Sequence, residues 1–169
     1  MVLSKPPPLS RILETCMMVK SMDVTRDFYT SVFALEPILS TPRITALAMD
    51  TARSHVLLLF QLGSTAEDSV DESKPDNVIP GHGPTEPVLK VLLNDAESLD
   101  NANWSGLKQH FCFAAKDRDE VLQWEEFLIE KKVPITGRMD WGQRGYSVYF
   151  ADPENNVGEI ASRRLWELL

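Results

Sequence analysis

A chain of 169 residues is long enough for one domain, or for two tightly fused half-domains, with a buried core. Its 43% hydrophobic and 25% charged residues are typical of globular proteins and exclude the disordered and fibrous classes. The formal net charge of -8 excludes nucleic acid as an expected partner, because a phosphate-binding face needs clustered Lys and Arg.

Neither a membrane segment nor a disulfide framework is predicted. The longest apolar stretch, Val56 to Phe60, is too short to span a bilayer, and the N-terminus has Lys5 and three prolines where a signal peptide has an apolar core. The only cysteines, Cys16 and Cys112, are too few for a disulfide-stapled scaffold. We therefore expect a cytoplasmic protein with free thiols and no membrane partner.

The first half of the chain reads as an N-terminal arm followed by a strand–helix–strands unit over residues 11–62. Residues 1–10 form the Pro-rich arm, and Ile12 to Val19 predicts an apolar strand. A helix is expected next, capped by Asp23, from the four-residue spacing of Val24, Phe28 and Val32, with Tyr29 and Phe33 widening the apolar stripe. Two strands then complete the unit, at Ile44 to Met49 and Val56 to Gln61.

Residues 63–107 form a connecting segment rich in Ser, Asp, Glu, Pro and Gly, which predicts a long exposed connection. Within it, Val88 to Leu93 fits either a short helix or a short strand. His82 is interpreted first as an exposed loop histidine, and alternatively as a group that closes over a cavity.

The second half, residues 108–169, repeats the first. Gln109 to Ala115 predicts a strand, and Asp117 with Glu120 forms a capping box for a helix whose apolar positions are Val121, Trp124 and Leu128. The returning strands are predicted at Arg138 to Trp141, Tyr146 to Ala151 and Val157 to Ala161.

Shifting the first half onto the second supports this repeat. A shift of 96 positions places Glu14 on His110 and Cys16 on Cys112, and a shift of 102 places Asp50 on Asp152. The expected fold class is therefore α+β, with one domain built from two related halves.

Candidate chemistry lies where polar residues interrupt apolar strands. A carboxylate such as Glu14 is costly to bury unless it is paired, protonated or bound to a metal. Strand alternation places Glu14 on the face of Cys16, His110 on the face of Cys112, and Glu159 on the face of Val157.

If the two halves pack about a pseudo-twofold axis, Glu14, His110 and Glu159 can meet at one cavity. Two carboxylates and an imidazole suit a divalent ion such as Zn, Fe, Mn, Ni or Co and leave positions open for substrate. The alternative interpretation gives each residue a structural role, with Glu14 exposed, His110 hydrogen-bonded in the core and Glu159 paired with Arg163 or Arg164.

Two stretches carry a family resemblance: Ile12 to Leu39, and more strongly His110 to Trp166 with GQRGYSVYFADPENNVGEIASRRLW. They resemble the vicinal oxygen chelate superfamily, which includes glyoxalase I, extradiol dioxygenases, and fosfomycin and bleomycin resistance proteins. The resemblance implies two βαβββ modules that form a cup-shaped, mostly antiparallel sheet with helices outside, around a metal that chelates adjacent oxygens of a small-molecule substrate.

Carried over by position, His110 and Glu159 resemble the second-module metal ligands, and Glu14 falls where the family usually has His or Gln. The first-module glutamate of glyoxalase I would fall near Leu57 or Leu58, so that ligand is absent and a true glyoxalase I is not expected. An extradiol dioxygenase is disfavoured because Glu14 replaces one His.

The expected function is a glyoxalase-like, metal-dependent lyase or isomerase in which Glu14 and Glu159 also transfer protons. Substrate contacts are expected from residues near the ligands and in the Gly-rich turn, namely Cys16, Cys112, Trp141, Arg144 and Tyr146. The alternative is a non-catalytic binding protein of the bleomycin resistance type; a metal-free acid–base enzyme is a further possibility. Pairing of modules between chains is common in the resembling family, which suggests a homodimer.

Overall fold

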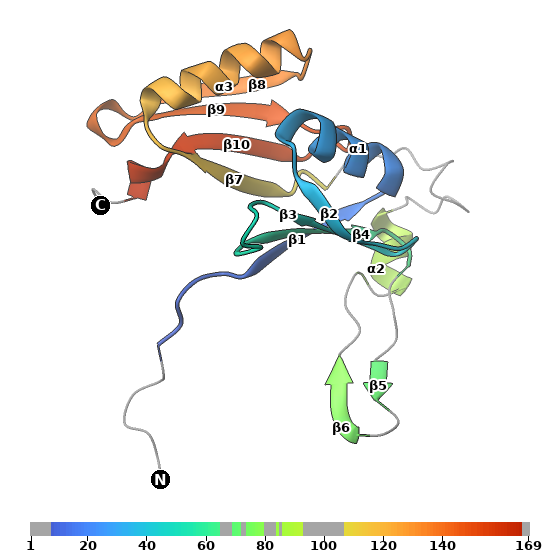
Figure 1. Cartoon of the computed structure of the whole chain (residues 1–169). Coiled ribbons are helices and arrows are strands. Elements are labelled where there is room, and N and C mark those ends of the chain that lie inside the picture. The colour runs from blue at the N-terminus through green and yellow to red at the C-terminus, as the bar shows by residue number, and fades with distance from the viewer. Residues whose placement is uncertain are drawn as a thin grey trace.

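The computed structural model describes residues 8–64, 69–71, 74–79, 84, 86–92 and 107–166 (Figure 1). Residues 1–7 of the predicted arm, His82 and the last three residues lie outside this range. The described part has the predicted α+β fold, with two βαβββ modules that each contain a mixed four-stranded sheet.

The first module begins with strand β1 (Glu14–Val19) and helix α1 (Met22–Phe33). Strands β2 (Glu36–Ser40), β3 (Ile44–Ala48) and β4 (Val56–Gln61) follow. The sheet order is β1-β4-β3-β2, with β1 parallel to β4 and the other pairs antiparallel. Strand β2 was not predicted because it contains Pro37, which a sheet accepts here since β2 is an edge strand.

The second module has the same plan. It consists of β7 (His110–Ala115), α3 (Arg118–Glu130), β8 (Ile135–Asp140), β9 (Tyr146–Ala151) and β10 (Val157–Ser162), in the sheet order β7-β10-β9-β8. Short 3-10 turns, η1 (Gly142–Arg144) and η2 (Arg163–Trp166), precede β9 and follow β10. The predicted cap is confirmed, because the Asp117 carboxylate accepts a hydrogen bond from the Glu120 amide at 3.1 Å.

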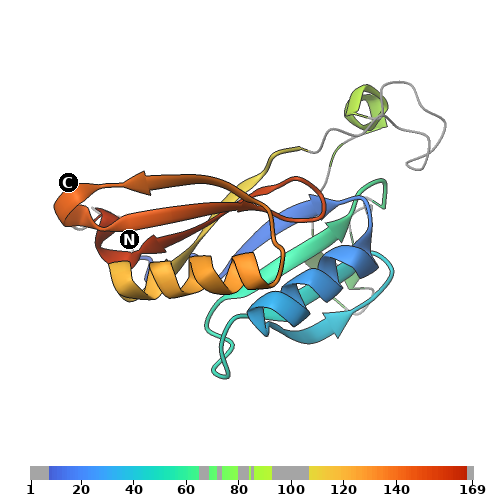
Figure 2. The same cartoon turned by 90° about the horizontal axis from the view of Figure 1, so that it is seen from above.

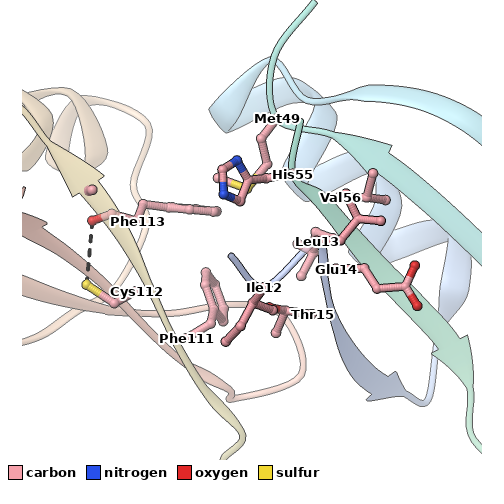
Figure 3. A pocket seen from close by; sticks show the side chains of 12 residues that line it. Ile12, Leu13, Glu14, Thr15, Met49, His55, Val56, Phe111, Cys112 and Phe113 are labelled. Atoms are coloured by element: carbon pink, nitrogen blue, oxygen red, sulfur yellow. Dashed lines mark hydrogen bonds between the residues drawn. The ribbon is translucent and has the colours of Figure 1, made fainter. Parts of the chain in front are cut away.

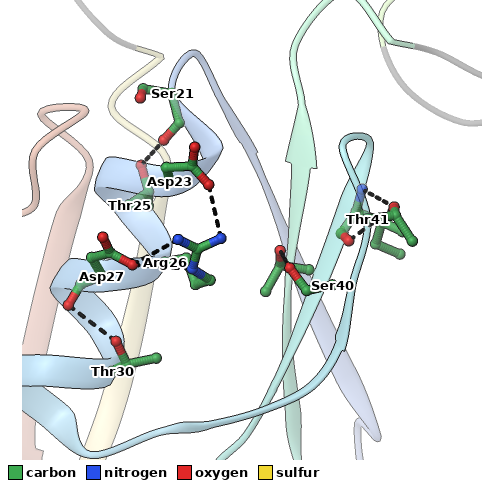
Figure 4. A network of polar contacts seen from close by, with 10 residues as sticks. Ser21, Asp23, Thr25, Arg26, Asp27, Thr30, Ser40 and Thr41 are labelled. Carbon is green, nitrogen blue, oxygen red and sulfur yellow. Dashed lines mark hydrogen bonds and ion pairs between the residues drawn. The ribbon is translucent and has the colours of Figure 1, made fainter.

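Helix α1 differs from its prediction at its start (Figure 4). Ser21 is the N-cap residue, and its carbonyl accepts a hydrogen bond from Thr25 Oγ1 at 2.9 Å. Asp23, predicted as the cap, lies within the first turn and pairs with Arg26 at 2.8 Å. The predicted apolar stripe packs on the core at Phe28, Tyr29, Val32 and Phe33, whereas its first residue, Val24, is 54% exposed.

The connecting segment contains an antiparallel hairpin of β5 (Ser69–Asp71) and β6 (Lys74–Ile79), then helix α2 (Glu86–Leu92). The stretch Val88 to Leu93, which the sequence left open, is therefore mainly helical. Figure 1 shows the hairpin standing apart from both modules. No helix in the described ranges is long and apolar enough to cross a membrane.

The two modules share one hydrophobic core, and α1 and α3 lie on the same side of the sheets (Figure 2). Phe33 of α1 packs against Phe113 of β7 and Trp124 of α3, with ring centroids 5.1 Å and 5.6 Å apart. The two sheets remain separate. Polar bonds also cross the seam between the modules, since the Tyr29 hydroxyl donates to Asp152 Oδ2 at 2.9 Å.

The structure confirms the internal repeat. Glu14 pairs with Val56, the first residue of β4, just as His110 pairs with Val157, the first residue of β10. The turns before these last strands also match. The Ser54 amide donates to Asp50 Oδ1 and the Asn156 amide to Asp152 Oδ1, each at 2.9 Å.

Candidate functional site

The polar cluster of the second module lies on the sheet face away from its core residues. Cys112 on β7 and Tyr149 on β9 flank Glu159 on β10 in one cross-strand row. His110 lies on the same face, since strand neighbours two residues apart share a face. The alternate residues Phe111 and Ile160 are buried in the core, so the predicted faces of β7 and β10 are correct.

Glu159 and His110 converge on this face. Glu159 is 5% exposed, and its Oε2 lies 3.4 Å from Nε2 of His110. The other ring nitrogen, Nδ1, lies 3.0 Å from the Val157 carbonyl oxygen. A carbonyl only accepts, so Nδ1 carries a proton, and in the neutral form of the ring Nε2 presents a lone pair. That lone pair and the Glu159 carboxylate are both electron-pair donors, so the arrangement requires a cation or a proton between them.

The second oxygen of Glu159 adds to this requirement. Oε1 is buried and has no hydrogen-bond partner among the described residues. Leaving a buried carboxylate oxygen unpaired is costly, so the site provides a place for a metal ion, a proton or a polar ligand.

The neighbours of Glu159 are both held in their protonated forms. Burial, followed by the charge of Glu159, raises the pKa of Cys112 to about 12. The same two causes raise the pKa of Tyr149 above its usual value. Both side chains are therefore hydrogen-bond donors at neutral pH, and the Cys112 thiol is not an activated nucleophile.

Glu14 does not join this cluster within one chain. It lies on β1 of the first module, and its carboxylate points away from the cavity between the modules (Figure 3). Across the residues that the structure describes, no three His, Cys, Asp or Glu side chains are grouped to hold a metal. The structure thus brings together His110 and Glu159 and leaves Glu14 on the exposed face of the other module.

The first-module counterpart of Glu159 is apolar. Leu58 pairs with Cys16 on β1, as Glu159 pairs with Cys112 on β7. This register resolves the sequence alternatives in favour of Leu58, and it confirms that the first module lacks a carboxylate at this position. The described cysteines, Cys16 and Cys112, are free as expected.

The residues proposed for the Gly-rich turn divide between the two faces of the second sheet. Trp141 Nε1 donates to Ser147 Oγ at 2.9 Å, and the guanidinium carbon of Arg144 lies 5.3 Å from the centroid of the Trp141 ring. Ser147 is on the Glu159 face, whereas Tyr146 packs against the core on the other face. Tyr149, which pairs with Glu159, is the tyrosine of β9 on the Glu159 face.

Sequence reasoning missed Tyr149 although the signal was present. Strand alternation puts every second residue of β9 on one face, and the antiparallel register opposite Glu159 selects Tyr149. That register depends on the turn before β10 and was not fixed by the strand pattern.

Comparison with known proteins agrees with the paired modules. The model of the Glyoxalase/Bleomycin resistance protein/Dioxygenase superfamily matches residues 11–160. The chain therefore belongs to this superfamily. No curated protein matches its sequence.

Solved structures give the same fold. Lactoylglutathione lyase from Agrobacterium tumefaciens is 27% identical, with a TM-score of 0.70 over 95% of this chain and 98% of that chain. The fosfomycin resistance protein FosX from Listeria monocytogenes is 16% identical, with a TM-score of 0.58 over 96% of this chain and 100% of that chain. A FosX mutant complexed with Mn(II) and 1S,2S-dihydroxypropylphosphonic acid is 15% identical, with a TM-score of 0.57 over the same shares.

Proposed function

We propose that this protein is a metal-dependent lyase or isomerase of the glyoxalase type that acts on a small molecule with adjacent oxygens. His110 and Glu159 would hold a divalent ion such as Zn, Fe, Mn, Ni or Co. The observation that carries the proposal is the convergence of the His110 Nε2 lone pair on the buried Glu159 carboxylate. The likeness to lactoylglutathione lyase supports the reaction class.

The donor set fits a metal ion. Two ligands about 2.1 Å from one ion at a tetrahedral angle are about 3.4 Å apart, which matches the separation of Nε2 and Oε2. The Val157 carbonyl fixes the tautomer and orientation of His110, as hydrogen bonds to metal-ligating histidines usually do. When bound, the ion would supply Lewis-acid polarisation of adjacent substrate oxygens.

The residues of the chain provide the rest of the chemistry. The Tyr149 hydroxyl and the Cys112 thiol stay protonated beside Glu159 and can donate hydrogen bonds to substrate oxygens. Trp141, held against Ser147, supplies an apolar wall at the edge of the same face, and Arg144 beside it supplies a positive charge. Glu159 and Glu14 are the proposed proton acceptors.

A homodimer would complete the site. The open face of the first module presents Glu14 to solvent, and the open face of the second module presents His110. A twofold axis that sets one face against the other would place Glu14 of a second copy opposite His110 and Glu159, and would form two identical cavities. Glu14 would then be the third ligand or the base.

The alternative function is small-molecule sequestration without catalysis, as in bleomycin resistance proteins. Leu58 favours it, because an apolar residue replaces the possible fourth ligand opposite Cys16. The unpaired Glu159 oxygen favours the metal-dependent enzyme, because a sequestering cavity has no need of a buried orphan carboxylate oxygen.

Elemental analysis of protein purified without chelators or a His-tag tests the proposal. We expect about one equivalent of a transition metal per chain, with a loss in His110→Ala and Glu159→Ala and no loss in the exposed control Glu130→Ala. Metal-free protein that also fails to take up added Zn, Ni, Mn or Fe would refute it and favour sequestration.

Mixing variants tests the shared site. In a dimer, Glu14→Ala chains refolded with Glu159→Ala chains give mixed pairs with one intact cavity, so about a quarter of the metal sites return. A site built within one chain would give no recovery on mixing.

A further inference from the structure

The cavity between the modules lies beside β7, where residues 111–114 line it. It has a volume of about 430 Å³, which is within the range of small-molecule pockets, roughly 300–1,000 Å³. Its walls are largely apolar, with Leu13 and Leu57 from the first module and Phe111 and Phe113 from the second. Figure 3 shows the His55 ring between Phe113 and Leu13.

The cavity exists because the internal repeat is broken there. At the opposite end of the seam, the Gln109 side chain bonds both the amide and the carbonyl of Met18, at 2.9 Å and 2.8 Å, and the Tyr29 hydroxyl bonds Asp152. Leu13 is the counterpart of Gln109, since the carbonyl of each accepts from the first residue of the last strand. The counterpart of Tyr29 in the repeat is Glu125.

These replacements leave the cavity open. Leucine has no amide with which to bridge the seam, and Glu125 is turned away to pair with Arg138. Polar side chains therefore fill the seam at the Gln109 end. The equivalent position at the Leu13 end is a hollow with apolar walls.

The hydrogen bonds of Ser54 indicate how the His55 ring at the cavity is bonded. The Ser54 hydroxyl is hydrogen-bonded to Asp50 Oδ2 and lies 3.1 Å from His55 Nδ1. Hydrogen bonds from Ser54 hold the pKa of Asp50 below its usual value, so Asp50 is an acceptor at neutral pH. Ser54 has one hydroxyl proton and gives it to Asp50, so its oxygen accepts from Nδ1–H of His55. In the neutral form of the ring, this hydrogen bond leaves His55 Nε2 as an acceptor.

We propose that this seam cavity is a binding site for a small neutral aromatic molecule with a hydroxyl group, of the phenol class, whose hydroxyl donates to His55 Nε2. The aromatic walls favour a ring, through edge and face contacts with Phe111 and Phe113. The Asp50 carboxylate, which is bonded to Ser54 beside His55, and the net charge of -8 disfavour an anion. His110 and Glu159 are not among the residues that line the cavity, although Cys112 is.

Protein-observed NMR with p-cresol and toluene as probes tests the inference. We expect p-cresol to shift the signals of Leu13, Thr15, Phe111 and Phe113. In His55→Phe, which keeps a ring but removes the acceptor, the Kd of p-cresol should rise roughly two- to tenfold while that of toluene is unchanged.

The matched control is His110→Phe, which alters the proposed metal site and should leave p-cresol affinity unchanged. If His55→Phe raises the Kd of p-cresol and of toluene equally, the assigned hydrogen bond to His55 is refuted. The spectra should be recorded with 10 mM p-cresol, about 100-fold above a typical NMR protein concentration. If no signals shift at the seam, or if only signals on the Glu159 face shift, the seam cavity is not the binding site. None of these outcomes depends on whether the protein binds metal.

Discussion

Substituting Tyr29 by Phe removes a hydroxyl that joins the two modules. Tyr29 on α1 is fully buried, and its hydroxyl donates to Asp152 Oδ2 at 2.9 Å, in the turn before β10. Asp152 is 4% exposed and also accepts from the amides of Glu154 and Asn156 and from the Asn156 side chain. The substitution therefore weakens the seam without leaving the carboxylate unpaired.

The expected loss follows from this geometry. A hydrogen bond to a charged group contributes about 1.5–3 kcal/mol, and the three remaining donors to Asp152 place the loss at the lower end, about 1.5–2 kcal/mol. For a chain of this size, that corresponds to a decrease in Tm of roughly 3–8 °C.

Urea unfolding followed by circular dichroism measures the difference. The matched control is Tyr146→Phe, which removes a tyrosine hydroxyl outside the Asp152 network and should change the free energy of unfolding by less than about 0.5 kcal/mol. Equal stabilities of Tyr29→Phe and wild type would refute the inferred contribution of the bond across the seam.

Tyr29 should also make the stability of the protein depend on pH. Burial, and then the neighbouring Asp152, raises the pKa of Tyr29 well above its usual 10.0. Its stabilising contribution is therefore complete below about pH 10, where the unfolded tyrosine is also protonated, and is lost as pH rises through the higher folded pKa. The difference in the free energy of unfolding between wild type and Tyr29→Phe should become smaller above about pH 10. A difference that stays constant up to about pH 11, one unit higher, would contradict this reasoning.

Two further predictions concern local structure. Gly145 has φ 118, and a Cβ there would overlap the side chain of Ser162, so Gly145→Ala should cost roughly 3 kcal/mol by thermal denaturation. Gly142→Ala, with φ 64 but open space around the new methyl, should cost only about 1 kcal/mol, and equal costs would contradict the overlap. Asp117→Ala removes the helix cap and should lower the free energy of unfolding by about 1 kcal/mol, since the Glu120 amide loses its acceptor. Asp117→Asn keeps an acceptor and should change it by only a few tenths of a kcal/mol. Equal losses in the two variants would argue against capping by Asp117.

Sequence patterns predicted the features that depend on neighbours along the chain. Strand alternation placed His110 and Cys112 on one face, and the Asp117 cap followed from three-residue spacing. The repeat predicted that Glu14 and His110 are equivalent, and the matching register confirms it. Local signals suffice for these features because backbone geometry alone sets periodicity and capping.

The ends of elements were less well predicted. Val24 fits the apolar spacing of α1 but is exposed, because the packing of Tyr29 against Phe111 of the second module sets which residues of the first turn face the core. Strand β2 was missed because its edge position, which tolerates Pro37, is a property of the whole sheet.

The sequence by itself determined two repeated α+β modules and the residue types of the proposed metal site on their strand faces. Only the tertiary structure decided that Glu159 meets His110 and Tyr149 while Glu14 faces away, and that the seam is closed at Tyr29 but hollow at His55. The reason is physical: periodicity fixes which face of a strand a side chain occupies, whereas the distance between faces depends on how the modules pack, through contacts between residues far apart in the chain.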